Sequence, residues 1–255
     1  MANGKSFAGA VDLALSMPNL SVGCHVVLID GEPVVGASDL PSLTASNTFR
    51  DGLKSFAARA VAGRIDSEEI TAEATAQIRK TQASGIRVSH FDTHKHTHVF
   101  PQVLRPLLRA AADCGVGALR NPFGPRMPLR SSELLARPKL WTRYAEVQVL
   151  RRFAGKFHNA VKREGFATPD GTLGIEVTGT LDEKLFHAIA SSIPDGTWEF
   201  VCHPGYNDAD LRDANTRLRE SRETELRVLT LPNARELLAK EGVELISYRD
   251  LLSES

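Results

Sequence analysis

Short runs of apolar and β-branched residues alternate along this chain with longer segments of helical periodicity. The predicted strands lie near residues 21–29, 87–93, 117–121, 172–177, 198–203 and 243–248. The predicted helices lie near residues 5–17, 67–84, 102–114, 140–164, 181–192 and 232–241. Such alternation is typical of βαβ units, in which parallel strands form a sheet with helices on both faces. The sequence therefore predicts an α/β fold.

The number of predicted units is smaller than a closed eight-stranded barrel requires. At 255 residues the chain suits one large domain, or at most two. An open or smaller barrel, or a barrel of which one part is missing, would agree with this count. Two long loops, residues 30–52 and 121–139, follow predicted strands, where the active sites of α/β proteins collect.

Composition argues against several classes of protein. Lys+Arg and Asp+Glu both number 31, so the net charge of zero gives no general attraction to nucleic acid. No apolar stretch reaches the roughly eighteen residues that a membrane-spanning helix needs. Cys24, Cys114 and Cys202 are odd in number and form no CxxC pair, so we expect no disulfide framework. A reducing, cytoplasmic location is therefore expected.

Local signals predict where two helices begin and end. Asp66 and Glu69 have the spacing of a capping box at the start of the second predicted helix. Gly115 follows the third predicted helix, as glycine often does at a helix end. Pro106 lies early in that helix and predicts a kink or a restart.

A nine-residue run carries His90, Asp92, His94, His96 and His98 at alternate positions. In extended backbone alternate side chains share a face, so Asp92 and His94, with His96 as a further candidate, would point the same way. Neutral imidazoles beside a carboxylate suit zinc or a similar divalent ion, with the carboxylate orienting a ligand ring. The alternative is a solvated His-rich loop that binds metal only incidentally.

His25 lies inside an apolar predicted strand, in the segment GCHVVL. A single histidine there is more often a hydrogen-bonded core residue than a ligand. It becomes a candidate metal ligand because sites on barrels take their ligands from the ends of several strands. By the same alternation, Cys24 and Cys202 point away from the faces of their neighbouring histidines, so we interpret both as small buried apolar residues.

Two further polar residues lie at the ends of predicted strands. His203 precedes Pro204 and Gly205, which cannot continue the strand. Its imidazole titrates near neutrality and could donate a proton to a leaving amine, although it could equally cap the turn. Arg120 could anchor a carboxylate or a sugar oxygen, or form a surface salt bridge instead.

These segments together resemble the YdjC-like family, which includes chitooligosaccharide deacetylases and hopanoid-biosynthesis-associated deacetylases. The matching pieces are GCHVVL, SHFDTHKHTHVFP, ALR, EFVCHPG and the closing EGVELISYRDLL, in order along nearly the whole chain. The resemblance implies a TIM-type (β/α) barrel and a divalent metal, magnesium or zinc, held by one Asp and two His.

Residue by residue, the resemblance places the two histidine ligands on His25 and His94. It places the proton-transferring histidine on His203 and an active-site arginine on Arg120. It also implies that Asp92 is a partner of the metal ligands at the substrate side of the site. His98, with His96 beside it, would line the substrate pocket.

One departure from the family pattern is serious. Family members open with a strand ending in Ala-Asp-Asp-Phe-Gly, whose aspartates bind the metal and act as general base, and no such run occurs here. The initial MANG instead resembles the end of the second strand of the family. We therefore expect a single (β/α)-barrel domain over residues 1–255 that lacks its first strand-helix unit.

The resulting hypothesis is metal-dependent hydrolysis of the acetamide of an N-acetylated sugar or oligosaccharide, by a protein that forms homodimers. Hydrolysis of another amide or an ester is one alternative. A non-catalytic barrel that binds metal or carbohydrate is another, which the missing aspartate pair favours. In the simplest alternative the histidines are structural.

Overall fold

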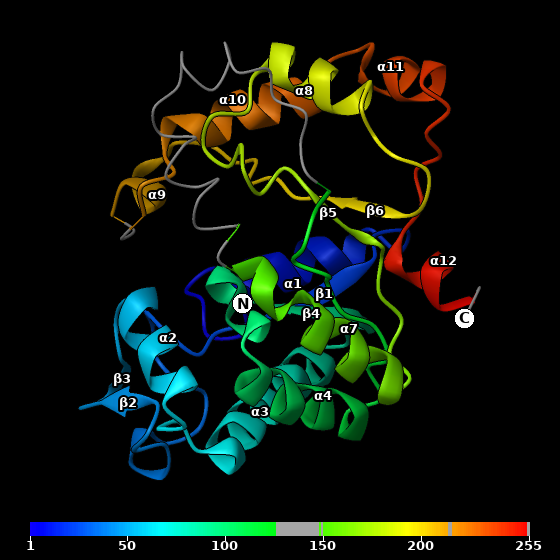
Figure 1. Cartoon of the computed structure of the whole chain (residues 1–255). Helices are drawn as coiled ribbons and strands as arrows, with labels where there is room; N and C mark the ends of the chain where they lie inside the picture. Colours follow the sequence, from blue (N-terminus) through cyan, green and yellow to red (C-terminus); the bar gives the residue numbers. More distant parts are fainter. Residues whose placement is uncertain (126–147, 149, 214–215, 254–255) are drawn as a thin grey trace. The chain divides into compact units, whose positions relative to one another are not determined.

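The computed structural model describes residues 1–125, 148, 150–213 and 216–253 (Figure 1). It has the mixed α/β composition that the alternating pattern predicts. The chain divides into two compact units. Unit 1 comprises Met1–Arg120, Arg152–Thr168 and Ser247–Ser255, and unit 2 comprises Asn121–Arg151 and Pro169–Ile246.

Unit 1 contains most of the helices that the sequence predicts. Its elements in chain order are α1 (Phe7–Ser16), β1 (Val22–Val26), η1 (Ala37–Asp39), β2 (Thr44–Ala45), β3 (Thr48–Phe49), α2 (Leu53–Val61), α3 (Ser67–Ala83), β4 (Val88–Thr93), η2 (His94–Val99), α4 (Pro101–Asp113), α7 (Ala154–Arg163) and α12 (Tyr248–Ser253). A short 3₁₀ turn, η3 (Arg151–Phe153), precedes α7. The three best-defined predictions in this unit, β4, α3 and α4, match the observed bounds to within a residue.

A parallel ladder forms the centre of unit 1. β1 pairs in parallel with β4, and His25 is directly opposite Asp92 in the register. The ladder continues through isolated parallel bridges from Phe91 to Leu119 and from Ala118 to Ala167. The predicted strand at 117–121 is thus reduced to a pair of bridging residues.

Buried apolar side chains of α3 and α4 pack beside this ladder. On α3 they recur every four residues, which places them on one face of the helix. The fully buried apolar residues of this region include Val27, Leu28, Ile29, Ile70, Ala74, Ile78, Val103, Leu104, Leu107 and Leu108. Burial of each large apolar side chain contributes about 1.5–3 kcal/mol, so this face of α3 fixes the helix against the sheet.

Polar residues on α3 hold the segment that follows β1. The Gln77 side chain accepts a hydrogen bond from the Val27 N–H (2.9 Å) and donates to the Val27 carbonyl (2.7 Å). The buried carboxylate of Glu73 accepts from the amides of Val34 (2.8 Å) and Val35 (2.9 Å). Three amides and one carbonyl of this segment, which has no regular structure, are thereby satisfied by side chains of one helix.

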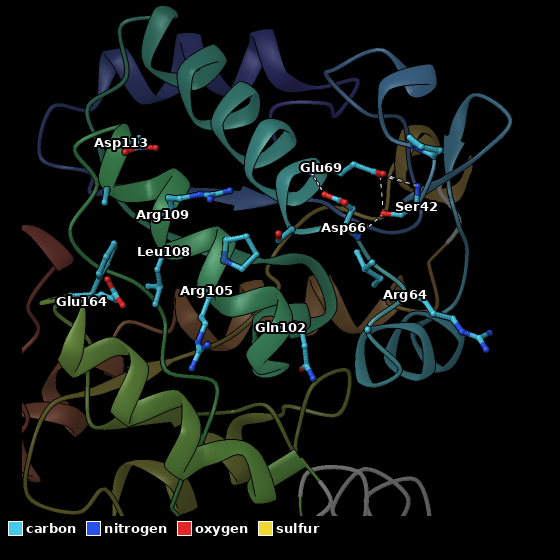
Figure 2. Close-up of a pocket in the computed structure, with 17 residues that line it drawn as sticks. Ser42, Arg64, Asp66, Glu69, Gln102, Arg105, Leu108, Arg109, Asp113 and Glu164 are labelled. Atoms are coloured by element: carbon cyan, nitrogen blue, oxygen red, sulfur yellow. Dashed lines mark hydrogen bonds between the residues drawn. The ribbon is translucent and has the colours of Figure 1, made fainter.

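The N-terminus of α3 shows a variation on the predicted capping box. The Asp66 side chain caps the helix, accepting from the amides of Glu68 (2.7 Å) and Glu69 (3.2 Å). The Glu69 carboxylate does not reach back to Asp66 but accepts from the Ser42 amide at 2.9 Å (Figure 2). The Asp66 amide donates instead to the Ser42 hydroxyl (2.9 Å). The box is therefore completed by a residue from the preceding loop.

The α4 helix agrees with the sequence at its C-terminus but not at its internal proline. Gly115 follows α4 with φ of 70°, the left-handed conformation that glycine adopts without steric cost. α4 continues through Pro106 as one helix instead of restarting there.

Unit 2 is built around a second parallel pair. Its elements are β5 (Gly171–Leu173), α8 (Glu183–Ala190), β6 (Trp198–Phe200), α9 (Ala209–Asp213), α10 (Glu220–Leu229) and α11 (Ala234–Lys240). β5 pairs in parallel with β6. Apolar residues of β5, α8, α10 and α11 share one buried cluster, which includes Leu173, Leu185, Ile189, Val228 and Ala234.

Three expectations from the sequence differ from the structure or extend beyond the residues that it describes. The predicted strand at 243–248 is wrong: residues 243–247 form no regular element, and α12 begins at Tyr248. Within the described residues the strands form three two-stranded sheets and no closed barrel is seen. The predicted loop at 121–139 lies outside the described residues beyond position 125. No helix in the described part of the chain has the length and apolarity to cross a membrane.

Candidate functional site

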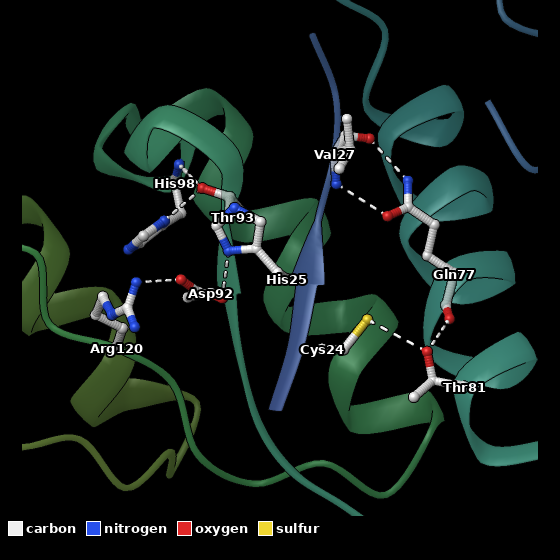
Figure 3. Close-up of polar contacts among 9 residues, drawn as sticks. All are labelled: Cys24, His25, Val27, Gln77, Thr81, Asp92, Thr93, His98 and Arg120. Carbon is white, nitrogen blue, oxygen red and sulfur yellow. Dashed lines mark hydrogen bonds and ion pairs between the residues drawn. The ribbon is translucent and has the colours of Figure 1, made fainter. Parts of the chain in front are cut away.

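His25 and Asp92 form a hydrogen-bonded pair across the β1–β4 ladder of unit 1. The His25 Nδ1 atom lies 2.8 Å from the Asp92 Oδ1 atom (Figure 3). Arg120 contacts the other Asp92 oxygen, Oδ2. Burial alone would raise the pKa of Asp92, but His25 and Arg120 together hold that pKa well below its usual range. Asp92 is therefore a buried carboxylate that stays ionised between two cationic or hydrogen-bonding partners.

The imidazole of His94 lies edge-on to the ring of His25. The ring centroids are 5.7 Å apart and the planes are inclined by 78°. Burial, with smaller contributions from the charges of His25 and Lys95, lowers the pKa of His94 to about 4. His94 is thus neutral at pH 7, which is the form of imidazole that binds metal ions.

The backbone after Asp92 differs from the extended run that the alternation predicts. β4 ends at Thr93, and Lys95 and His96 adopt left-handed conformations with φ of 52° and 54°. The prediction that His96 shares a face with Asp92 by strand alternation is therefore wrong. Non-glycine residues in this conformation cost free energy and cluster at functional sites.

His98 lies fully buried at the end of this turn. Its Nδ1 atom is 2.6 Å from the Thr93 hydroxyl, which also accepts from the His98 amide (3.1 Å). Burial lowers the pKa of His98 to about 4 and that of His96 to about 3. The His98 Nε2 and His96 Nδ1 atoms are buried and have no hydrogen-bond partner among the described residues.

Asp30 is a neighbour of His94 that the sequence reasoning missed. One of its oxygens, Oδ2, lies 3.9 Å from His94 Nε2 and 2.5 Å from Lys95 Nζ. Partial burial raises the pKa of Asp30, but hydrogen bonds from Lys95 and the Gly52 amide lower it overall. The signal in the sequence is an acidic residue directly after the apolar segment that carries His25.

The side chains at this site can be compared with the metal ligands that the family resemblance implies. His25 uses Nδ1 for Asp92, which leaves its Nε2 for a ligand, and His94 is neutral. The two imidazoles therefore fit the histidine part of the expected ligand set. Across the described residues, however, no group of three or more His, Cys, Asp or Glu side chains is arranged to hold a metal ion.

The predicted site residues fall in both units. His25, Asp92, His94 and Arg120 come together in unit 1, with His98 one turn beyond them. His203 belongs to unit 2, where it follows β6 and its backbone amide donates to the Glu225 carboxylate. Cys24 is buried and faces Thr81 on α3, which agrees with its interpretation as an apolar core residue.

A large open groove in unit 1 lies apart from these residues. It has a volume of about 1230 Å³ and is lined by the loops before α3, the α3 N-terminus, α4 and the residues that follow α7 (Figure 2). Its charged residues are of both signs: Arg64, Arg105 and Arg109 are basic, and Asp66, Glu69, Asp113 and Glu164 are acidic. The histidine site does not contribute to its lining.

Comparison with known proteins adds two findings. A family model described as YdjC-like protein matches residues 1–240. A crystal structure from Enterococcus faecalis V583, of a candidate cellobiose-phosphate cleavage protein, is similar with a TM-score of 0.71 and 21% sequence identity. The similarity covers 98% of this chain and 85% of that one, and at this identity it shows a shared fold alone.

Proposed function

Because the chain belongs to the YdjC-like family, we propose that it is a metal-dependent carbohydrate deacetylase. The reaction would hydrolyse the acetamide of an N-acetylated sugar or oligosaccharide, releasing acetate and an amino sugar. The observation that carries the proposal is the hydrogen-bonded His25–Asp92 pair with the neutral His94 beside it. These residues lie at or after the carboxyl ends of two paired parallel strands, where α/β enzymes place their chemistry.

The proposal extends to the fold, the cellular location and the oligomeric state. The parallel ladders of both units and the likeness to the Enterococcus protein support a TIM-type (β/α) barrel, with residues 1–255 as one domain. We also propose a cytoplasmic homodimer, because the cysteines form no CxxC pair and the family resemblance suggests a dimer. The balanced charge gives no general attraction to nucleic acid or anionic membranes. Sedimentation of the purified protein would test the dimer.

His25 and His94 would hold the divalent ion, either magnesium or zinc. When bound, such an ion supplies Lewis acidity, which polarises a carbonyl oxygen and makes a water molecule more acidic. Asp92 keeps the proton of His25 on Nδ1, so that the Nε2 lone pair stays available. Arg120 neutralises part of the Asp92 charge and holds the carboxylate in place.

The remaining predicted residues act on the sugar and on the proton. His98 and Arg120 would bind sugar oxygens, as the family resemblance implies for these two positions. His203 would donate a proton to the departing amine nitrogen, which must leave as a neutral amine. The general base of the family comes from an aspartate pair that this sequence does not contain, so no residue is assigned to that step.

The test is acetate release from a panel of N-acetylated mono- and oligosaccharides, with and without added zinc or magnesium. His94→Ala should lose both metal retention and turnover, since it removes one of two imidazole ligands. The exposed His158 on α7 provides the matched control, and His158→Ala should behave as the wild-type protein. Unchanged turnover in His94→Ala would overturn the assignment of the site.

The same panel of substrates distinguishes a deacetylase from another hydrolase and from a binding protein. Turnover of aryl esters or other amides, without acetate release from sugars, would indicate a different hydrolase. Metal retention without any turnover would indicate a binding protein. A phosphorylated disaccharide belongs in the panel, because the similar Enterococcus protein is described as a candidate cellobiose-phosphate cleavage protein.

A further inference from the structure

The segment after β6 is attached to α10 by alternate backbone amides. The His203 amide donates to Glu225 Oε2 (2.5 Å) and the Gly205 amide donates to the Arg222 carbonyl (3.2 Å). The Asn207 amide donates to Glu223 Oε1 (3.1 Å). Pro204 has no N–H, so this turn depends on the amides on either side of the proline.

Glu225 differs from the other groups that hold this segment. Its side chain is buried, with 1% of the residue exposed, whereas Glu223 is exposed. Its second oxygen, Oε1, accepts from the Gly179 amide at 3.3 Å. Gly179 lies between β5 and α8, so one carboxylate joins the segments that follow two adjacent parallel strands.

Burying a carboxylate at this position costs desolvation free energy. α10 contributes Val228 to the apolar cluster of unit 2, and an apolar residue at position 225 would be cheaper to bury. The carboxylate is instead satisfied by two backbone amides. Hydrogen bonds to a charged group are stronger than neutral ones, which makes Glu225 an effective anchor for both segments.

We infer that Glu225 is the positioning residue of His203, holding its backbone where the imidazole can deliver a proton to the leaving group. The inference rests on the proposed function, in which His203 acts as the proton donor. Segments that follow the carboxyl ends of parallel strands carry the working side chains of α/β enzymes. Their backbones need such anchoring, because a small misplacement of a catalytic group lowers the rate strongly.

The contact itself is tested by amide hydrogen exchange in the full-length protein. Glu225→Leu should accelerate exchange at His203 and Gly179, because both amides lose their acceptor. Glu225→Gln keeps one acceptor oxygen and should give an intermediate effect. Glu223→Gln, on the same helix, is the matched control and should leave both amides unchanged. Equal exchange at His203 in all four proteins would overturn the inference.

The role in catalysis is tested with two substrates that differ in their leaving groups. An amine must be protonated as it leaves, whereas the nitrophenolate of p-nitrophenyl acetate leaves without a proton. Glu225→Leu should lower acetate release from an N-acetyl sugar by about 100-fold, in the range of general acid catalysis. It should lower p-nitrophenyl acetate hydrolysis by less than about 3-fold, and Glu225→Gln should restore part of the sugar activity. An equal loss on both substrates would show a merely structural role and overturn the inference.

A double-mutant cycle with His203→Ala distinguishes this inference from the proposed function. If Glu225 acts through His203, Glu225→Leu should cause no further loss in the His203→Ala background. Loss in His203→Ala without loss in Glu225→Leu would overturn the inference and leave the proposed function standing. Full amide hydrolysis by His203→Ala would overturn the proton-donor role of His203 and the inference together.

Discussion

The His25 Nδ1 and Asp92 Oδ1 atoms lie 2.8 Å apart, and the two residues are in direct register across parallel strands β1 and β4. Their pairing therefore depends on the strand register as well as on the two side chains. Side chains alternate between the faces of a sheet, so a shift of one residue would place His25 and Asp92 on opposite faces.

Asp92→Asn should weaken metal binding. The substitution keeps the size of the side chain but removes the charge that faces His25 and Arg120. Loss of such a partner of a metal ligand lowers affinity about 10–100-fold. Calorimetric titration with zinc measures the effect. Glu68→Gln, which alters an exposed ion pair with Arg109, is the control, and a wild-type affinity in Asp92→Asn would contradict the assignment.

Gly23→Ala should destabilise the protein. A Cβ atom at position 23 would lie 2.4 Å from His90 Nε2, and the His90 ring is stacked on Tyr248 with centroids 3.6 Å apart. Overpacking of this kind costs about 1–3 kcal/mol, which urea unfolding would measure. Gly9→Ala on α1, where a Cβ meets nothing within 4 Å, should be neutral or stabilising. Equal stability of the two variants would refute the steric explanation.

Gln77→Ala should cost more stability than its small volume change suggests. The substitution leaves the buried Val27 N–H and C=O groups without partners. Each unsatisfied buried group costs about 1–3 kcal/mol, so the midpoint of urea unfolding should fall clearly. Thr75→Ala, a half-buried position on the same helix, is the control. A loss no larger than that of the control would mean that water replaces the amide.

The free energy of unfolding should depend on pH through the titration of Glu73. Burial raises the pKa of Glu73, so the folded state favours the protonated carboxyl. Its contribution to stability is complete below the unfolded pKa of about 4.3 and is lost as pH rises through the higher folded pKa. The free energy of unfolding of the wild type, minus that of Glu73→Gln, should therefore decrease as the pH rises above the unfolded pKa. A difference that rises with pH would reverse the assigned sign.

The sequence predicts those helices whose periodicity and end signals lie in, or directly beside, the helix itself. α3 and α4 are predicted closely because their apolar periodicity, the Asp66 cap and Gly115 all lie within the elements themselves. The proximity of His25, Asp92 and His94 is expected only from the family resemblance, which makes the two histidines metal ligands and Asp92 their partner. Alternation within one strand does not predict the hydrogen bond between β1 and β4.

The features that the sequence does not predict depend on contacts between distant residues. The left-handed turn at Lys95 breaks the alternation that the His-rich run suggests. Asp30 approaches His94 from the irregular segment after β1, and the periodicity of the sequence does not predict the course of such a segment. Glu225 is one acidic residue in a helix of mixed charge, and only its burial distinguishes it from Glu223.

The amide of Gln77 also bears on how the chain avoids unwanted assembly. In the described residues β1 pairs with β4 on one side only, and exposed strand edges are templates for pairing with other chains. Just past the end of β1, Gln77 takes both the donor and the acceptor of Val27, as a neighbouring strand would. The helix thus blocks edge-to-edge aggregation at that position by imitating the hydrogen bonds of the strand that would otherwise add there.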